Sequence, residues 1–197
     1  MLKRYTEEEM LAFWKRRLGL SSSPGVVGTS DGNRLDAKLT DDIRAWYADL
    51  LLTAPRQLLP CEDLKDESTG RYVGENCMEL VLPERGVRFV SLKLEAWDAA
   101  VEATFAPASR RAGLQKYRET WATPDAPVIV EGVHRLFVHG LPSGNVPMAA
   151  QSAGEAGNVP PYRPLPPVES LMMVAAPADG AFVLDPSLLR YGEMLVG

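Results

Sequence analysis

The chain has 197 residues, of which 46% are hydrophobic and 24% charged, so it can bury a core in one domain or in one domain with an appendage. Its formal net charge of −5 disfavours non-specific binding to nucleic acid, which needs a basic face, but is compatible with a local basic patch. The opening residues MLKRYTEEEM lack the apolar region of a signal peptide, and no apolar run is long enough to span a membrane.

Two helices are predicted at the N-terminal end. The first follows Thr6, which can cap it with Glu9 at the capping-box position, and it ends at Gly19. The second runs from Thr40 to the residue before Pro55. The residues expected on the apolar faces are Met10, Phe13, Trp14 and Leu18 in the first helix and Ile43, Trp46, Tyr47, Leu50 and Leu51 in the second. Between them, residues 21–38 are polar and glycine-rich and predict a long flexible loop.

Strands are predicted in the middle of the chain, after a turn-rich connector. They are expected at 78–82, at 87–97, as a third candidate at 101–105, and at 128–131 and 134–138 with Gly132 at the turn. The stretch from Val90 to Trp97 alternates apolar and polar residues, which is typical of a strand with one buried face and one wet face. Residues 108–121 fit a loosely spaced helix or an irregular crossing segment equally well.

The C-terminal end is rich in glycine and proline. Residues 143–158 predict a loop, and 160–167 favour polyproline II. A hairpin is expected over 170–185 with Asp179-Gly180 as its turn, followed by a short helix over 186–196. The fold class is therefore α+β, with N-terminal amphipathic helices and a mostly antiparallel β-sheet or sandwich. The expected parts are a helical part, 1–56 with the flexible loop 21–38, and a β-rich part, 57–197 with the Gly/Pro-rich arm 143–168.

No motif for catalysis is present. The chain lacks a nucleophile elbow, a Walker-type loop and a dinucleotide fingerprint. His134 and His139 are five residues apart, which places them on opposite faces of a strand and makes them poor partners in one site. Cys61 and Cys77 predict two free thiols, rather than one disulfide or half of a metal site. A cysteine nucleophile paired with either histidine would make the chain an enzyme, but no local signature supports this alternative.

Carboxylates are the other candidate chemistry. Four form a dense cluster: Glu62, Asp63, Asp66 and Glu67. Their spacing lacks the alternating ligands of an EF-hand, so a solvated loop is favoured over a divalent cation site. The pairs Glu75 with Glu79 and Asp98 with Glu102 are expected by chance in any acidic chain. The sequence thus predicts no catalytic, cofactor-binding or metal-binding residue, no cofactor and no enzymatic activity.

Two stretches are candidates for binding partners. One is a basic cluster of Arg110, Arg111, Lys116 and Arg118, which is either a solvated face or a contact for nucleic acid or an acidic neighbouring subunit. The other is RPLPP, Arg163–Pro167. It matches proline-rich ligands read by SH3 domains, but five residues are a weak signal, and a stiff spacer that leads back to the last hairpin is the favoured interpretation. The alternative function is therefore a non-catalytic protein–protein binding module that presents the segment 160–167.

A longer pattern runs from MELVLPERG at 78–86 to HRLFVHG at 134–140. It comprises a strand ending in Leu-Pro, a hydrophobic strand ending in Trp97, a Pro-x-Ser, a glutamine, a strand that begins with Pro-Val, and a last strand of the Leu-x-Val type. This pattern resembles the structural proteins of Bacteroidetes phages and prophages, crAss-like or of another short-tailed type, that form head-to-tail adaptors and rings. Two amphipathic helices precede the strands there as they do here, and DPSLLRYGEML is similar to the closing helix of those proteins; the resemblance covers roughly residues 40–197. The chain departs from the pattern at Glu84-Arg85-Gly86, where the family has an acidic-aromatic pair.

The resemblance implies a virion structural protein without catalytic activity. It implies a homo-oligomeric ring, dodecameric as in the family, that lies between portal and tail proteins in the virion after assembly in the host bacterial cytoplasm. DNA would pass through its channel without sequence-specific binding, and an acidic net charge suits a channel that does not grip DNA. Loops 21–38 and 143–168 would be arms that become ordered on assembly. No membrane is involved in this role.

Overall fold

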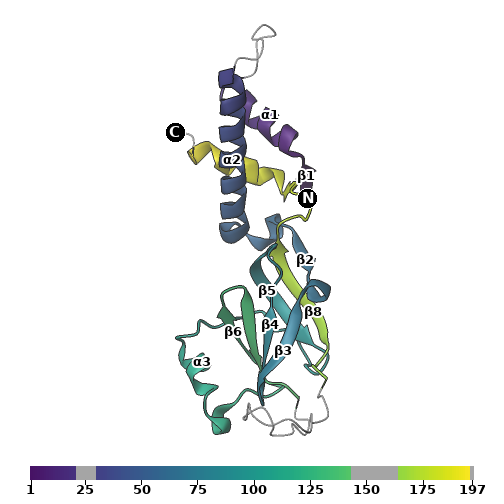
Figure 1. Ribbon diagram of the computed structural model, residues 1–197. Coiled ribbons are helices and arrows are strands. Elements are labelled where there is room, and N and C mark those ends of the chain that lie inside the picture. Colours follow the sequence, from purple (N-terminus) through teal and green to yellow (C-terminus); the bar gives the residue numbers. More distant parts are fainter. Residues whose placement is uncertain (21–29, 143–163, 196–197) are drawn as a thin grey trace, which may run out of the picture. The chain divides into compact units, whose positions relative to one another are not determined.

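The computed structural model describes residues 1–20, 30–142 and 164–195 (Figure 1). Helices make up 32% and mostly antiparallel sheets 33%, which confirms the predicted α+β class. The chain forms two compact units: unit 1 comprises Met1–Cys61 and Val174–Gly197, and unit 2 comprises Glu62–Met173. This division differs from the expected parts 1–56 and 57–197, because the C-terminal segment contacts the N-terminal helices. The arm 143–168 lies outside the described residues except for 164–168.

Helix α1, Glu7–Arg17, is built as its sequence predicts. The Thr6 hydroxyl accepts a hydrogen bond from the Glu9 amide (3.2 Å), and the Glu9 carboxylate accepts one from the Thr6 amide (2.9 Å). This reciprocal capping satisfies two amides that the first turn would otherwise leave unpaired. Leu18 caps the C-terminal end, and Gly19 follows in a left-handed conformation (φ 68°) that suits glycine.

Helix α2, Ser30–Thr53, begins ten residues before the predicted start at Thr40. The prediction of a loop over 21–38 is therefore wrong for residues 30–38, while residues 21–29 lie outside the described part. Asp36, inside the supposed loop, binds the Lys15 ammonium of α1 at 2.6 Å, and Leu39 is buried. These contacts stabilise a polar helical stretch whose own apolar periodicity is weak, and extending an existing helix costs little. The predicted end before Pro55 is confirmed.

The core of unit 1 joins the two helices to the last strand. The Trp14 and Trp46 rings meet edge to face at 5.6 Å, and the Tyr47 and Phe182 rings at 5.1 Å. Strand β9, Phe182–Leu184, pairs antiparallel with β1, Lys3–Tyr5. The Tyr47 hydroxyl donates to the Val183 carbonyl (3.0 Å) and accepts from the Val183 amide (3.1 Å), so α2 is tied to the backbone of β9.

Residues 170–185 do not form the predicted hairpin. Gly180 makes the expected turn in a left-handed conformation (φ 73°), but β8, Val168–Ala175, pairs with β2 and β5, and β9 pairs with β1. The turn was predicted correctly, but β8 and β9 do not pair with each other across it. Pairing across a turn competes with pairing to strands elsewhere in the chain, and here each strand has a distant partner. The predicted closing helix is present as a 3₁₀-helix, η4, Pro186–Leu195, which buries Leu188 and Leu189.

Two sheets have most of their residues in unit 2. The four-stranded sheet has the order β3-β4-β7-β6 and is antiparallel throughout. Its strands are β3 Thr69–Gly74, β4 Cys77–Val81, β7 Arg135–His139 and β6 Val128–Gly132. The three-stranded sheet has the order β2-β8-β5, with β2 at Cys61–Asp63 and β5 at Gly86–Leu94. Strands β1, β2 and β3 were not predicted, because each is short or lies in turn-rich sequence.

Strand β5 shows the predicted alternation, with Leu92 and Leu94 buried and Lys93 paired with Glu169 at 2.6 Å. It ends before the predicted Trp97, which is buried in the turn that follows. The third candidate strand, 101–105, is reduced to isolated bridges at Val101 and Phe105.

Short helical turns link the strands. Residues 108–121 combine the two predicted alternatives, as a short helix α3, Arg110–Leu114, is followed by a crossing segment with the 3₁₀-turn η3, Arg118–Thr120. The other two 3₁₀-turns are η1, Arg56–Leu58, and η2, Lys65–Glu67. Among the residues that the structure describes, no helix combines the length and the apolar character that crossing a membrane requires.

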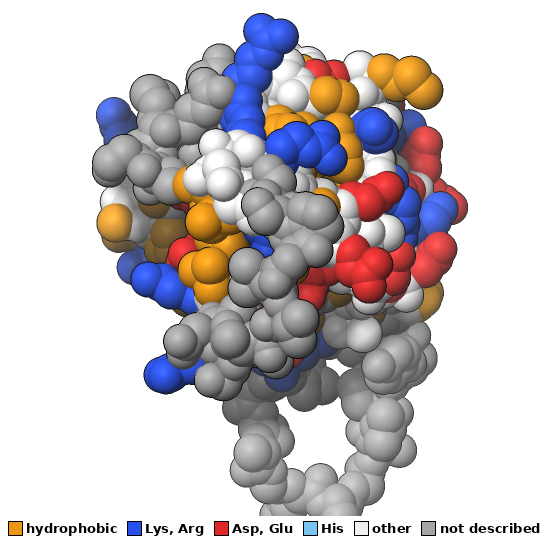
Figure 2. Space-filling view, turned by 90° about the horizontal axis from the view of Figure 1, so that it is seen from above, with side chains coloured by type: hydrophobic (Ala, Val, Ile, Leu, Met, Phe, Trp, Pro, Cys, Tyr) orange, Lys and Arg blue, Asp and Glu red, His pale blue; other side chains and the backbone are white. Residues whose placement is uncertain are grey.

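Surface charge is mixed on the face seen in Figure 2. Lys and Arg side chains spread around this face, while acidic side chains gather on one side of it. Hydrophobic side chains lie between them in small groups. A mixture of this kind is normal for a protein surface and assigns no partner by itself.

Candidate functional site

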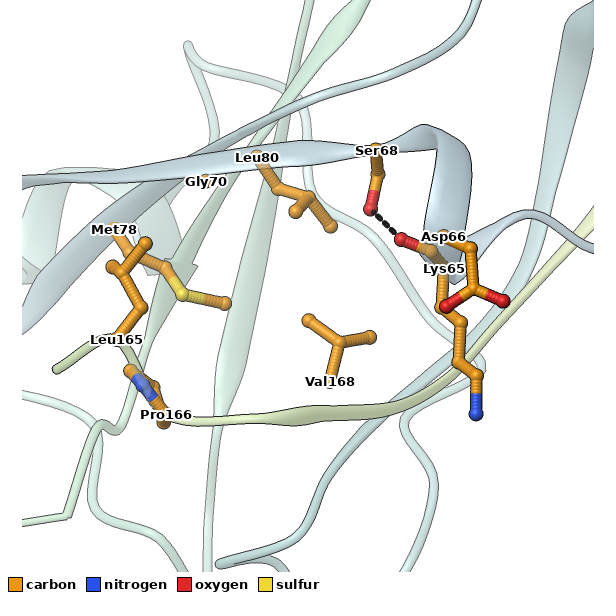
Figure 3. A pocket seen from close by; sticks show the side chains of 9 residues that line it. All are labelled: Lys65, Asp66, Ser68, Gly70, Met78, Leu80, Leu165, Pro166 and Val168. Carbon is orange, nitrogen blue, oxygen red and sulfur yellow. Dashed lines mark hydrogen bonds between the residues drawn. The ribbon is translucent and has the colours of Figure 1, made fainter.

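A cavity of about 320 Å³ lies in unit 2, against the face of the four-stranded sheet that carries Met78 and Leu80 (Figure 3). Leu165, Pro166 and Val168 form its opposite side. Lys65, Asp66 and Ser68 lie at one end, where the Ser68 hydroxyl donates to the Lys65 carbonyl (2.8 Å). The lining offers apolar surface, one hydroxyl and two opposite charges, but no histidine or cysteine. It can accommodate an apolar group and supplies no nucleophile with an adjacent base.

The proline-rich segment supplies part of this lining. The Tyr72 hydroxyl donates to the Pro164 carbonyl (3.1 Å), the Glu95 amide donates to the Pro167 carbonyl (3.1 Å), and Pro166 is buried. Residues 164–167 are therefore held against unit 2, as a spacer would be. The remaining residues of the segment 160–167, Arg163 among them, lie outside the described part of the chain.

The predicted acidic cluster is divided among internal contacts. Glu62 and Glu67 both bind the Arg85 guanidinium at 2.5 Å, which raises the pKa of Arg85 and lowers that of Glu67. The Asp63 carboxylate accepts hydrogen bonds from the Lys65 amide (3.1 Å) and the Leu171 amide (2.9 Å). Three of the four carboxylates thus stabilise the start of unit 2, and Asp66 borders the cavity. Within 1–20, 30–142 and 164–195, no group of three potential metal ligands converges.

Sequence reasoning missed Glu79, a charged residue that is buried in unit 2. Its side chain is only 2% exposed and lies between two arginines on the neighbouring strands, Arg71 of β3 and Arg135 of β7, each at 2.5 Å. The hydrogen bond from Arg71, opposed by burial and reinforced by the hydrogen bond from Arg135, lowers the pKa of Glu79 below its ordinary value of 4.5. From the sequence, Glu79 was considered only in a chance pair with Glu75, because the strand register that brings Arg71 and Arg135 beside it could not be read there. Glu75 itself is exposed, as are Asp98 and Glu102.

The ion pairs of Glu79 with Arg71 and Arg135, which we call the Glu79 clamp, predict a loss of protein stability in acid. Because the pKa of Glu79 is lowered on folding, its contribution is present above the unfolded pKa and is lost as the pH falls through the folded pKa. We expect E79Q to be less stable than the wild type at neutral pH, with a difference that shrinks on acidification. Urea unfolding at a series of pH values measures this difference. The control E84Q, at an exposed carboxylate, should follow the wild-type profile, and a difference for E79Q that does not change with pH would contradict the clamp.

Cys77 and His139 are the one cysteine–histidine contact in the described residues. They are directly opposite on β4 and β7, with Cys77 Sγ 3.7 Å from His139 Nε2. Burial, reinforced by the charge of Glu79, raises the pKa of Cys77 to about 12, and burial lowers the pKa of His139. Both groups are therefore neutral at pH 7, whereas a catalytic pair needs a thiolate and an imidazolium. His134 lies apart, exposed in the β6–β7 turn with φ 51°, and the turn falls one residue after the predicted Gly132.

Thiol titration should separate the two cysteines, both of which are free. Cys61 is exposed, whereas Cys77 is half-buried and almost entirely protonated at pH 8. We expect one fast and one slow reaction with an aromatic disulfide reagent. C61S should remove the fast phase, and C77S the slow one. A Cys77 that reacts faster than Cys61 would overturn this assignment and revive the cysteine-enzyme alternative.

The basic cluster lies on the crossing segment of unit 2. Arg110 and Arg111 begin α3, Lys116 follows it, and Arg118 begins η3. All four side chains are exposed.

Comparison of the chain with protein families, with curated proteins and with solved structures found no match in any of the three.

Proposed function

We propose that this chain is a virion structural protein: a ring-forming head-to-tail adaptor between portal and tail. One observation carries the proposal. The anchor residues of the sequence pattern that resembles phage adaptors coincide with contacts that hold unit 2 together. The fold depends on these anchors through partners that lie, for example, three residues away for Ser109 and 43 residues away for Trp97.

Three anchors make specific hydrogen bonds. The Trp97 indole that ends the hydrophobic strand donates to the Gly140 carbonyl (2.9 Å) in the buried interior. Ser109, of the Pro-x-Ser, caps α3 by accepting from the Ala112 amide (3.2 Å). The Gln115 side chain accepts from the Ala122 amide (2.8 Å) and closes the crossing segment.

The remaining anchors are strand residues of the core. Val128, Ile129 and Val130 of β6 are buried, as are Leu136 and Val138 of β7, and the two strands pair in register. Leu-Pro at 82–83 ends β4 and leads into β5, and the Leu82 amide donates to the His134 carbonyl (3.0 Å). After the short strand β1, the chain forms two helices, then strands with short helical turns between them, and a closing 3₁₀-helix, which is the order that the resemblance implies apart from β1.

In this role the protein acts by assembly. Copies would associate into a ring, bind the portal on one side and a tail protein on the other, and leave a passage for DNA. A ring requires a heterologous contact, in which two different surfaces of neighbouring copies meet. Unit 1 and unit 2 each have a core of their own, so each can supply a rigid surface for such a contact.

The mass of the purified protein in solution tests this proposal. Light scattering across a wide concentration series, followed by electron microscopy of the largest species, should reveal a closed oligomer of one size. The same measurement after mixing with the products of adjacent genes covers assembly that needs a portal. A chain that stays monomeric alone and in every mixture contradicts the proposal.

A further inference from the structure

Unit 2 carries a surface that we call the basic platform: residues 105–122, with the cations Arg110, Arg111, Lys116 and Arg118. Within these residues there is a single acid, Glu119, although the whole chain is acidic. None of the four cations forms an ion pair with another part of the chain that the structure describes. By contrast, Arg71, Arg85 and Arg135 in the same unit each bind a carboxylate. The platform therefore has unused positive charge.

Aromatic rings hold two of these cations in place. The Arg111 guanidinium lies over the Phe105 ring, 5.5 Å from its centroid, and the Arg118 guanidinium lies over Trp121 at 5.8 Å. Stacking restricts a long side chain while its N–H groups remain available to an outside acceptor. Tyr117, between these residues, is 63% exposed and presents an aromatic ring to solvent.

The backbone beneath the platform is fixed by hydrogen bonds. The Thr120 hydroxyl donates to the Leu114 carbonyl (2.6 Å), and the Asn76 amide side chain donates to the Ala122 carbonyl (2.8 Å). Phe105 extends the edge of β6, because its amide donates to the Ile129 carbonyl (2.8 Å) and its carbonyl accepts from the Glu131 amide (2.9 Å). Figure 1 shows α3 beside β6, which it contacts. The cations are thus presented from a rigid base, which lowers the entropy lost on binding.

We infer that the basic platform binds the phosphodiester backbone of nucleic acid. Guanidinium and ammonium groups are the usual donors to phosphate oxygens, and an exposed tyrosine between them is a stacking platform for an unpaired base. Phosphodiester nucleic acid matches both features of the platform, since phosphates match its unpaired cations and an unstacked base matches the exposed Tyr117 ring; an acidic protein surface is the competing occupant that the experiment below separates. The inference does not depend on ring formation; in a ring adaptor this surface would contact the DNA that passes.

The overall negative charge sets the strength of this binding. Repulsion from the rest of the chain is screened beyond about 10 Å at 0.1 M salt, so a local patch still attracts phosphate. About three or four phosphate contacts give a weak, salt-sensitive interaction, with a slope of log K against log salt near −3 for duplex DNA. Contact of this strength lets a strand slide across the surface.

Fluorescence anisotropy with a labelled oligonucleotide, duplex and single-stranded, tests the inference across a salt series. The variant R110A/K116A removes two exposed cations that stack on no ring, so it should fold as the wild type does. We expect its affinity for both oligonucleotides to fall by roughly tenfold or more at low salt and the salt slope to decrease by about 2 in magnitude. Y117A should weaken binding of the single strand alone.

The control R16A/R56A removes the same charge from exposed positions in unit 1 and should leave binding unchanged. Polyglutamate is the competing acidic-protein probe. The inference would be overturned if R110A/K116A bound the oligonucleotides as tightly as the wild type. It would also be overturned if the wild type bound polyglutamate and neither oligonucleotide. If the protein forms a ring that has no affinity for DNA, this inference is refuted and the adaptor proposal is not. If the protein stays monomeric alone and in every mixture and binds DNA through the basic platform, the adaptor proposal is refuted and this inference is not.

Discussion

The Gly140→Ala variant is expected to lose about 3–5 kcal/mol of the free energy of unfolding of unit 2. Gly140 has φ 90°, and a Cβ there would lie 2.6 Å from the Thr123 carbonyl oxygen and 3.0 Å from Pro127 Cα, both backbone atoms that cannot move aside. Its own carbonyl receives the buried Trp97 indole, so a shift of residue 140 also breaks that hydrogen bond. Urea unfolding followed by tryptophan fluorescence, with hydrogen exchange of the Trp97 indole, measures the loss.

Gly180→Ala is the matched control. Gly180 is also left-handed (φ 73°), but a Cβ there would meet no atom within 4 Å. Only the conformational cost of about 1–2 kcal/mol applies. Gly180 lies in unit 1 and Gly140 in unit 2, so the control shows the size of the conformational cost alone, and a loss at Gly140 well above it reports the steric contact. Equal losses for both variants would show that the close approach to Thr123 and Pro127 does not exist.

The Trp46→Ala variant is expected to destabilise unit 1 by about 3–5 kcal/mol. The Trp46 side chain is 5% exposed and its ring meets Trp14 edge to face, so its removal leaves a cavity between α1 and α2. Chemical denaturation followed by far-UV circular dichroism reports the loss, because the helices of the described chain lie mainly in unit 1. Far-UV detection also avoids the change in tryptophan fluorescence that the substitution itself causes.

Leu52→Ala on the same helix provides the comparison. Leu52 is 55% exposed, so its truncation is expected to change stability by less than about 0.5 kcal/mol. A loss for Trp46→Ala as small as that for Leu52→Ala would mean that α1 does not pack against α2 through the tryptophans. A large loss for Leu52→Ala would instead indicate that this exposed leucine is covered in an assembly.

Local signals in the sequence determined the elements whose formation depends on neighbouring residues. The Thr6–Glu9 capping box, the end of α2 before Pro55 and the alternation through Leu92 and Leu94 were all read correctly. Each depends on residues a few positions apart, whose hydrogen bonds and periodicity are visible in the chain itself. The α+β class follows from the same signals.

Only the tertiary structure decided which distant segments meet. The start of α2 depends on contacts of Asp36 and Leu39 that outweigh a polar local sequence. The pairing of β9 with β1, instead of the hairpin with β8, is a choice between partners that local propensity does not encode. The Glu79 clamp and the Cys77–His139 contact need the register of β4 between β3 and β7. Such pairings arise from burial summed over the whole unit, and a shift of register by one residue would turn every side chain of a strand to the other face.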